Sequence, residues 1–348
     1  MQKENLFDIK KYTFNLPSIL IAQEPKEPAD SCRLLIVDRK FKSFKEVIFK
    51  DIVDFLKKDE ILVLNNTKVI PAKLIAKKQT GAKIEILLVK EIDSYTWEAL
   101  IRPARRLKLN DVLIFDKEVT AKNIGVTKYG GRILRFSIPN LIQFFKKIGK
   151  APLPHYIKKD IDNLNKYQTI YAKKEGAIAA PTAGFHFTTD LLEKIKDKGI
   201  KIVEITLHCG LSTFRPIKFE DIRQHKLEPE YIEVSEDAVD IINEAKSTKK
   251  RIIAVGTTTV RALESLAFIN NEGIANIKPF KGEINIYIFE GYKFKIIDSL
   301  ITNFHTPCST NLLLVSAFCG YRLLMKAYNY AIKKSFRFYS FGDAMYII

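Results

Sequence analysis

Short apolar runs separated by turn residues fill about the first 140 positions of the chain. Residues 131–137 alternate apolar and polar side chains, which is the period of a half-buried strand. Because residues 72–138 consist almost wholly of such runs, with turn residues between them, they predict a small β-barrel. The strands predicted in this part of the chain are 33–38, 61–65, 82–89, 95–101, 111–115 and 131–137.

After residue 154 the pattern alternates between helices and strands. A predicted helix over 189–198 has Leu191, Leu192 and Ile195 on one face and is followed by Gly199, a typical residue after a helix end. Ser235 precedes an acidic first turn, which predicts a capped helix over 235–246. The other predicted elements are strands at 200–207, 251–255 and 284–289, and helices over 260–268 and from residue 309 onward.

The two patterns together define the expected fold class. The alternating part predicts an α/β domain, made of residues 1–71 and 150–348, with a mixed β-sheet or a barrel as its core. The β-rich part interrupts that domain, so residues 72–149 are expected to form a smaller, inserted all-β barrel. Loops that follow strand ends are where α/β folds bind ligands.

The composition favours an acidic partner. The 348 residues include 57 Lys and Arg against 40 Asp and Glu, a formal net charge of +17. Such an excess favours a polyanion, first of all nucleic acid, unless the lysines only solvate the surface. No run approaches the ~18 apolar residues of a membrane span, and the N-terminus lacks a signal-peptide core. We expect a cytoplasmic protein with no membrane partner.

The four cysteines lack Cys-x-x-Cys spacing, which argues against a disulfide framework and against a thiolate zinc site. We expect them to be small, buried and reduced side chains. A nucleophilic role for Cys209 or Cys308 is the less favoured alternative. The four are Cys32, Cys209, Cys308 and Cys319.

Three segments combine one histidine with threonines, aromatic residues and turn formers. Histidine exchanges protons near neutral pH, and small or conformationally free residues let another molecule approach the backbone. We predict that the three loops form one composite pocket in which the histidines transfer protons or bind a substrate. The segments are 179–188, 207–216 and 302–307, and their histidines are His186, His208 and His305.

Two other interpretations of these histidines remain open. They could be the three ligands of a catalytic zinc, although none forms a His-x-His or His-x-x-x-His pair and no acidic residue adjoins them to orient the rings. Each taken singly could also be a structural, buried histidine. Proton transfer without a metal is the favoured interpretation.

The segment 256–261, Gly-Thr-Thr-Thr-Val-Arg, places a glycine and three threonines at the predicted start of a helix. Free N–H groups and hydroxyls at such a turn form an anion site, and Arg261 could pair with a carboxylate or phosphate. The alternative is plain N-capping by Thr257 or Thr258. No Walker A or Gly-x-Gly-x-x-Gly motif is present, which argues against an ATPase and a Rossmann enzyme.

A basic segment follows the second predicted strand of the barrel. A barrel rim with four cations could follow a phosphate backbone, or it could be a solvated charged loop. The residues are Arg102, Arg105, Arg106 and Lys108.

With these segments in view, the chain resembles the S-adenosylmethionine:tRNA ribosyltransferase-isomerase family of queuosine biosynthesis nearly from end to end. Several ordered motifs of this length do not match by chance. The motifs are 16–23, Asn66-Thr-Lys-Val-Ile-Pro-Ala72, 167–172, Ala179-Ala-Pro-Thr-Ala-Gly-Phe-His-Phe-Thr188, 207–216, Gly256-Thr-Thr-Thr-Val-Arg-Ala-Leu-Glu-Ser265, Thr302-Asn-Phe-His305 and Phe341-Gly-Asp-Ala344.

The resemblance implies an α/β domain with an inserted barrel and a specific reaction. The ribosyl group of S-adenosylmethionine moves to 7-aminomethyl-7-deazaguanine at the tRNA wobble position and is isomerised, which gives epoxyqueuosine and releases adenine and methionine. S-adenosylmethionine is then a cosubstrate, and neither a prosthetic group nor a metal is expected. The implied partners are the Asn, Asp, His and Tyr tRNAs, and a monomer is expected.

The resemblance also implies site residues. His186, His208 and His305 are the candidates for removing a ribose proton and for helping adenine depart, and Thr258 and Arg261 would hold the methionine carboxylate or a phosphate. The full set expected to bind substrates is Thr182, Gly184, Thr213, Arg215, Thr257, Thr258, Arg261, Glu264 and Asn303.

The chain departs from the family pattern at three positions. His155 stands where a proline is usual, Glu228 where a histidine is common, and Glu290 where a proline is expected. Two rival functions remain: a non-catalytic RNA-binding protein, which would need the basic surface alone, and a metal-dependent hydrolase, which would use the three loop histidines.

Overall fold

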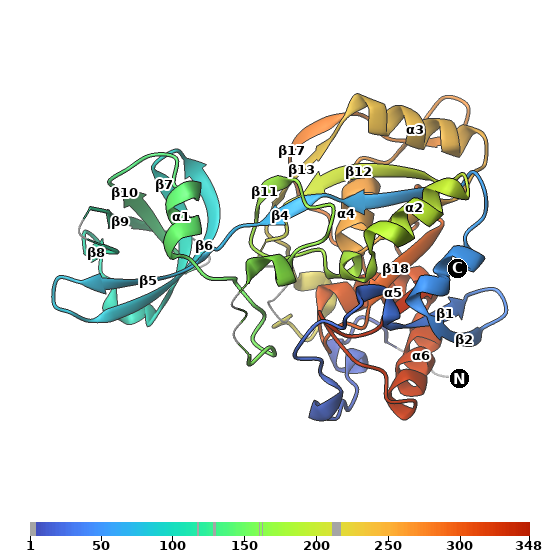
Figure 1. Cartoon of the computed structure of the whole chain (residues 1–348), viewed down its shortest axis with the longest axis horizontal. Coiled ribbons are helices and arrows are strands. Elements are labelled where there is room, and N and C mark those ends of the chain that lie inside the picture. Colours follow the sequence, from blue (N-terminus) through green and yellow to red (C-terminus); the bar gives the residue numbers. More distant parts are fainter. Residues whose placement is uncertain (1–4, 117, 128–129, 160, 162, 211–216) are drawn as a thin grey trace.

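The computed structural model describes residues 5–116, 118–127, 130–159, 161, 163–210 and 217–348. An α/β domain stands beside a closed barrel of six antiparallel strands, and the two lie along the long axis of the molecule (Figure 1). The predicted fold class is confirmed, and the core of the α/β domain is an open mixed sheet, not a barrel. No helix in these parts of the chain is long and apolar enough to cross a membrane.

The elements follow the chain in this order. The strands are β1 (Arg33–Asp38), β2 (Ser43–Ile48), β3 (Ile61–Asn65), β4 (Thr67–Val69), β5 (Lys73–Lys78), β6 (Lys83–Asp93), β7 (Thr96–Arg102), β8 (Val112–Ile114), β9 (Thr120–Val126), β10 (Arg132–Phe136), β11 (Lys174–Ala177), β12 (Lys201–Leu207), β13 (Glu230–Val234), β14 (Ile252–Val255), β15 (Phe268–Ile269), β16 (Ala275–Asn276), β17 (Phe280–Ile284), β18 (Ser299–Asn303) and β19 (Ala344–Ile347). The α-helices are α1 (Ile142–Ile148), α2 (Thr189–Asp197), α3 (Glu236–Ser247), α4 (Thr257–Ser265), α5 (Thr310–Cys319) and α6 (Tyr321–Lys333). The 3-10 helices include η4 (Phe49–Phe55), η5 (Ala104–Arg106) and η7 (Thr182–His186).

The large sheet has nine strands in the order β17-β13-β12-β3-β14-β18-β19-β1-β2. Its centre is parallel, because β3 pairs in parallel with both β12 and β14, and β14 does so with β18. Both margins contain antiparallel pairs, as in β12 with β13 and β1 with β2. The parallel centre brings the carboxyl ends of β3, β12, β14 and β18 to one edge, which is where the predicted loops begin.

The central strands are buried on both faces, which explains their continuous apolar sequence. In β3, Ile61 and Val63 join one core and Leu62 and Leu64 join the other. The first core is covered by α3, α4, α5 and α6, and the second by α2 and η4. The domain is therefore a three-layer sandwich of helices around one sheet.

The barrel has the strand order β10-β7-β6-β5-β8-β9, with every neighbouring pair antiparallel. Its interior holds a separate apolar core in which Trp97 and Phe136 pack edge-on against Phe145 of α1. The chain enters the barrel after β4 and leaves it after α1 (Figure 1). We keep residues 72–149 as the proposed bounds of this domain.

Most predicted elements are present within one or two residues, but two predictions were wrong. The strand predicted over 284–289 lies instead at β17, because residues 280–284 pair with β13, while Tyr287 and Phe289 pack their rings against each other outside any strand. The helix predicted over 260–268 is α4, which begins at Thr257 and ends at Ser265. The elements that were not predicted are helix α1 and strands β2, β4, β5, β9, β11, β13, β15, β16, β18 and β19.

Candidate functional site

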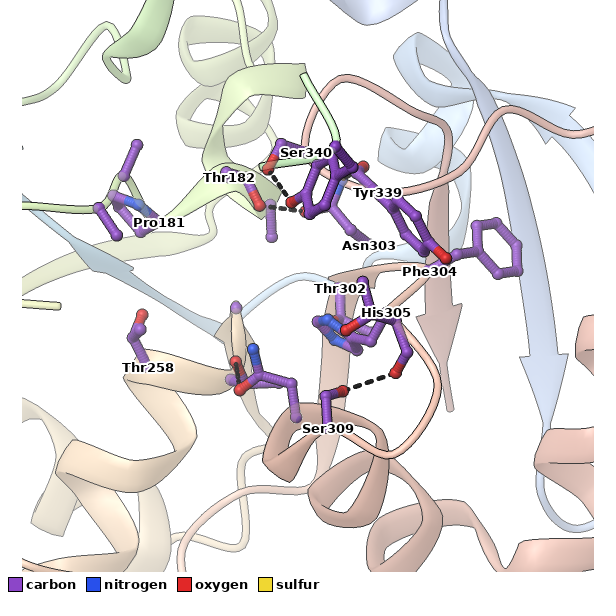
Figure 2. Close-up of a pocket in the computed structure, with 18 of the residues that line it drawn as sticks. Pro181, Thr182, Thr258, Thr302, Asn303, Phe304, His305, Ser309, Tyr339 and Ser340 are labelled. Atoms are coloured by element: carbon purple, nitrogen blue, oxygen red, sulfur yellow. Dashed lines mark hydrogen bonds between the residues drawn. The ribbon is translucent and has the colours of Figure 1, made fainter. Parts of the chain in front are cut away.

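Two cavities lie at the edge of the sheet where the predicted loops meet. The first cavity has a volume of about 80 Å³ and is formed by segments far apart in the sequence (Figure 2). It is lined by residues 155–156, Tyr167, 179–183, 256–258, 302–306, Ser309, Asn311 and 339–340. The second cavity, of about 770 Å³, lies between the barrel and the α/β domain and is lined by residues 89–91, 97–98, Ile142, 174–176, 208–210, 228–231, Glu233 and Glu283.

The start of α4 lies at the first cavity. Gly256 precedes the helix with φ +88°, a conformation that favours glycine, and no side chain caps the free N–H groups. Thr257 donates to Asn311 Oδ1 at 3.0 Å, and the Thr258 hydroxyl accepts from Asn65 Nδ2 at 3.2 Å. The alternative of plain N-capping by Thr257 or Thr258 is therefore wrong, and the helix start keeps the character of an anion site.

A second helix begins at the same cavity. Ser309 caps α5 by accepting from the backbone N–H of Leu312 at 3.2 Å. Asn311, in the first turn of α5, holds the side chain of Thr257 in the first turn of α4. The positive ends of two helix dipoles thus face one small cavity, which favours a negatively charged group there.

His305 is the loop histidine that lines the first cavity (Figure 2). Its Nε2 lies 2.8 Å from the hydroxyl of Thr302, and its backbone N–H donates to the Tyr328 hydroxyl at 2.7 Å. Both contacts fix the ring and its loop after β18. One nitrogen, Nδ1, has no partner among the described residues.

His186 lies behind the first cavity and acts through Asn303. Its ring is 2% exposed and packs on Phe49, with ring centroids 5.0 Å apart. Its Nε2 accepts from Asn303 Nδ2 at 3.2 Å, and Asn303 Oδ1 accepts from Thr182 at 2.8 Å. Asn303 and Thr182 line the cavity, so His186 orients the amide that faces it.

His208 lines the second cavity, so the three histidines do not share one pocket. Its Nδ1 lies 2.7 Å from the Thr67 hydroxyl, and its ring stacks on Tyr231 with centroids 5.2 Å apart. No group of three His, Cys, Asp or Glu side chains in the described parts of the chain is placed to hold a metal ion. The loop histidines, all of which are described, therefore do not form the zinc site considered as an alternative.

Burial keeps all three histidines neutral at pH 7. It lowers the pKa of His186 and of His208 to about 4, and that of His305 to about 3, from the ordinary value of 6.5. A neutral imidazole accepts a proton or a hydrogen bond. In the unliganded protein none of the three is a ready proton donor.

These shifts predict that the protein loses stability between about pH 6.5 and pH 4. In that window the unfolded chain binds protons that the folded chain does not, so the free energy of unfolding falls as the pH falls. His186 alone contributes about 3 kcal/mol to this loss. Chemical denaturation of the wild type and His186→Gln at pH 7 and 4.5 checks it, because the variant should lose less. An equal loss in both proteins would contradict the prediction.

Arg261 is paired inside the protein. Its guanidinium forms a buried ion pair with Glu230 of β13, and the side chains are 7% and 4% exposed. Glu230 Oε1 also accepts from the backbone N–H of Gly210 at 3.0 Å, at the start of the segment that follows β12. Arg261 was predicted to bind a carboxylate or phosphate of a ligand, but it already pairs with a carboxylate of the protein, which favours a structural role over substrate binding.

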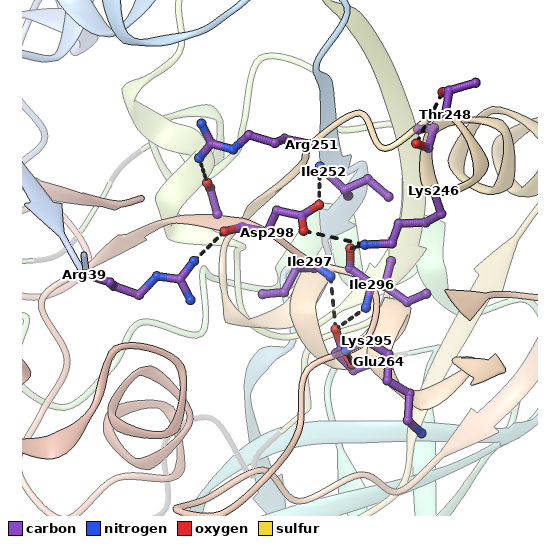
Figure 3. Close-up of polar contacts among 12 residues, drawn as sticks. Arg39, Lys246, Thr248, Arg251, Ile252, Glu264, Lys295, Ile296, Ile297 and Asp298 are labelled. Carbon is purple, nitrogen blue, oxygen red and sulfur yellow. Dashed lines mark hydrogen bonds and ion pairs between the residues drawn. The ribbon is translucent and has the colours of Figure 1, made fainter. Parts of the chain in front are cut away.

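Glu264 is also occupied by the protein. Its two oxygens accept from the backbone N–H groups of residues 295–297 at 2.9–3.1 Å, and the Tyr292 hydroxyl lies 3.2 Å away (Figure 3). Gly184 has a packing role, because a Cβ there would lie 2.0 Å from the Tyr171 hydroxyl. Neither residue lines the first or the second cavity. Thr213 and Arg215 lie outside the described residues.

The four basic residues of the barrel are exposed on and around η5, between β7 and β8. They stand apart from the residues that line the first and second cavities. The side chains are Arg102, Arg105, Arg106 and Lys108.

Two of the three departures from the family pattern line cavities: His155 the first and Glu228 the second. Glu290 is half-buried, and burial raises the pKa of its carboxyl. Burial also raises the pKa of the thiols of Cys209 and Cys308, which makes them poor nucleophiles at neutral pH.

Several residues that line the first cavity were not predicted as site residues from the sequence. Asn311 had a usable signal, because it is a polar residue at the start of an otherwise apolar helix. Tyr167 opens the motif 167–172, which was a usable signal as well. Tyr156 and Tyr339 had none, since aromatic residues far apart in the sequence meet only in the folded chain. The missed residues are Tyr156, Tyr167, Asn311, Tyr339 and Ser340.

The fold and the site define a class: α/β proteins with an inserted antiparallel barrel and a polar cavity at the starts of two helices. The chain matches the family model described as queuosine biosynthesis protein over residues 9–347. It therefore belongs to the queuosine biosynthesis protein family.

Individual relatives cover nearly the whole chain. One from Thermotoga petrophila is 44% identical over 340 residues, 98% of this chain and 99% of the relative. One from Thermoanaerobacter sp. is 49% identical over 341 residues, 97% and 99% of the two chains. Both are named S-adenosylmethionine:tRNA ribosyltransferase-isomerase. The crystal structure of S-adenosylmethionine tRNA ribosyltransferase from Thermotoga maritima has 35% identity and a TM-score of 0.55, covering 97% of this chain and 100% of that chain.

Proposed function

We propose that this protein is an S-adenosylmethionine-dependent tRNA ribosyltransferase-isomerase. The ribosyl group of S-adenosylmethionine is transferred to the aminomethyl group of 7-aminomethyl-7-deazaguanine at the wobble position and isomerised to an epoxycyclopentanediol. The products are epoxyqueuosine in tRNA, adenine and methionine. Family membership over nearly the whole chain supports the proposal.

The observation that carries the proposal is the convergence of the family motifs on the first cavity. Segments 179–183, 256–258 and 302–306, which are up to about 120 residues apart, line it together. A cavity of about 80 Å³ is below the ~300–1,000 Å³ typical of pockets that enclose whole ligands. The starts of α4 and α5 favour an anion, so we place the amino-acid end of the donor here, with its carboxylate at the two helix starts.

The reaction needs a proton acceptor beside the donor. The sulfonium acidifies the adjacent 5′ carbon of the ribose, and a nearby base removes that proton. We assign this role to His305, because it lines the same cavity and has an unprotonated ring nitrogen at pH 7. A donor carboxylate bound beside it would raise the pKa of the imidazole from its low value in the empty cavity and make it a stronger base. His186 acts indirectly, by holding the Asn303 amide toward the substrate.

We further propose that the protein acts in the cytoplasm as a monomer on the Asn, Asp, His and Tyr tRNAs, with the basic rim of the barrel contacting the RNA backbone. The net charge of +17 supports a polyanionic partner. Exposure of all four cations on one short segment supports their contact with phosphates.

We expect a variant with four glutamines in the basic segment to bind tRNAs of every sequence more weakly. The replaced residues are Arg102, Arg105, Arg106 and Lys108. Each lost phosphate contact lowers the slope of log K against log salt by about 1, so the slope should fall by about 3–4. Fluorescence titration at several salt concentrations measures it. An unchanged slope would return these residues to the role of a solvated loop.

The function is tested by incubating the purified protein with labelled S-adenosylmethionine and tRNA that carries the deazaguanine precursor. Adenine release and transfer of ribose label to the tRNA, in equal amounts, are expected. Binding of tRNA without either product would favour the rival, a non-catalytic RNA-binding protein. Activity lost to chelators and restored by zinc would favour the metal-dependent hydrolase.

A further inference from the structure

The second cavity is built by both parts of the molecule. Strands β6 and β7 of the barrel supply one wall, and β11, β13 and the segment after β12 supply the other. Its volume of about 770 Å³ lies within the range of pockets that enclose a nucleoside-sized ligand. It adjoins the first cavity, because Ala179 of the first and Cys209 of the second are paired through a backbone bridge.

The charge of this cavity is opposite to that of the chain. Seven glutamates and two lysines line it, although the chain as a whole carries a net charge of +17. Four of the glutamates are compensated by cations of the protein: Glu283 by Lys90, Glu233 by Lys174, Glu175 by Lys146 and Glu230 by Arg261.

Glu91 and Glu98 have no cationic partner among the described residues. They stand on the neighbouring strands β6 and β7, where Glu91 is in register with Trp97, the residue before Glu98. Partial burial and the neighbouring Asp93 carboxylate raise the pKa of the exposed Glu91 carboxyl. Because side chains alternate along a strand, Glu91 shares the face of Trp97, and Glu98 lies on the alternate face. A carboxylate without a cation that lines a cavity favours a cationic ligand.

Polar groups of the same cavity point to a flat heterocycle. Trp97 is 2% exposed and lines the cavity, yet its indole N–H has no hydrogen-bond acceptor among the described residues. A buried donor of this kind needs an acceptor, such as a ring nitrogen or carbonyl of a base. Gly176 has φ +147° and lies against the ring of His208. A Cβ atom at residue 176 would be only 2.5 Å from His208 Nε2, so the glycine leaves room for this ring. The stacked rings of His208 and Tyr231 add an aromatic wall.

We propose that the second cavity binds a guanine-like base that carries a protonated aminomethyl group, with Glu91 holding the ammonium and the Trp97 indole, on the same face, donating to the base. This inference rests on the proposed function and identifies where the acceptor is recognised. A guanine at the same position lacks the ammonium, so the Glu91 carboxylate makes the protein specific for the modified base.

The donor is a poorer fit for this cavity. S-adenosylmethionine carries a carboxylate as well as two cationic groups, and the uncompensated carboxylates that line this cavity would repel its carboxylate. The helix starts at the first cavity attract that group. Donor and acceptor then lie in adjoining cavities, on the two sides of the bridge between Ala179 and Cys209.

The test uses the full chain and two anticodon stem-loops that differ only in the wobble base, 7-aminomethyl-7-deazaguanine or guanine. Kd values for both RNAs and for S-adenosylmethionine are measured at one salt concentration for the wild type, Glu91→Gln and Glu98→Gln. We expect Glu91→Gln to bind the modified RNA about 10-fold more weakly and Glu98→Gln, on the alternate face, to lose clearly less. Both variants should bind guanine RNA and S-adenosylmethionine as the wild type does. Glu193→Gln, an exposed position on α2, is the matched control and should change none of the three.

Three results would overturn the inference: a wild type that does not distinguish the RNAs, equal losses for both RNAs in the variants, or a loss confined to S-adenosylmethionine. The ratio of the Kd values for the two RNAs is measured without turnover. If the variants keep the wild-type ratio and release adenine normally, this inference alone is wrong. If the wild type distinguishes the two RNAs but releases no adenine, the proposed function alone is wrong.

Discussion

Replacing Arg261 with methionine is expected to lower the free energy of unfolding by about 3–5 kcal/mol, because it breaks a buried ion pair and leaves the Glu230 carboxylate buried after the Arg261 guanidinium is gone. The side chains of this pair are 7% and 4% exposed, so water cannot compensate the remaining charge. Urea denaturation at pH 7 measures the loss. The backbone of Gly210, which Glu230 holds, should loosen at the same time.

A second substitution distinguishes a structural role from a ligand-binding role. Adding Glu230→Gln to Arg261→Met removes the charge that Arg261 compensated but keeps an acceptor for Gly210, so most of the stability should return. Lys10→Met, which breaks the exposed pair with Glu220, is the control and should change stability by less than about 0.5 kcal/mol. If Arg261→Met left stability intact and only weakened S-adenosylmethionine binding, the original assignment of Arg261 to the substrate would be right.

His305→Gln is expected to reduce turnover by about 100-fold or more, the usual scale of lost acid–base catalysis. Glutamine fills a similar volume and can still bond the Thr302 hydroxyl, so the fold should be preserved. Single-turnover adenine release with saturating substrates measures the chemical step without the binding steps.

His186→Gln is the matched comparison. Its amide oxygen can accept from Asn303 as the imidazole does, so the loss should be clearly smaller than for His305→Gln. Equal losses in the two variants would mean that His186 takes part in proton transfer. Wild-type turnover in His305→Gln would remove His305 from the mechanism.

Local pattern was sufficient where an element's environment is uniform. Strands β1 and β3 occupy the predicted residues, because a strand buried on both faces is apolar throughout. Helix α2 begins after a threonine that caps it and ends before Gly199, as its sequence requires. The strand predicted over 284–289 was wrong, because aromatic residues that pair their rings outside a sheet give the same apolar sequence pattern as a strand.

The candidate site shows the same division. Thr257, Thr258, Asn303 and His305 were selected from short motifs, and the structure brings them to one cavity. Arg261 and Glu264 come from the same motifs but are occupied by Glu230 and by the backbone at 295–297. A motif identifies which residues a family keeps, and it does not separate those that bind a ligand from those that hold the site together.

The sequence by itself determined the two-part architecture, the family and the loops that carry chemistry, because periodicity and motifs are local properties of a chain. The tertiary structure decided which of those residues meet. It separated His208 from His305, buried His186 behind Asn303, and set uncompensated carboxylates of the barrel opposite the α/β domain. Such contacts join residues about 100 positions apart. They depend on how the sheet and the barrel pack, which no local pattern encodes.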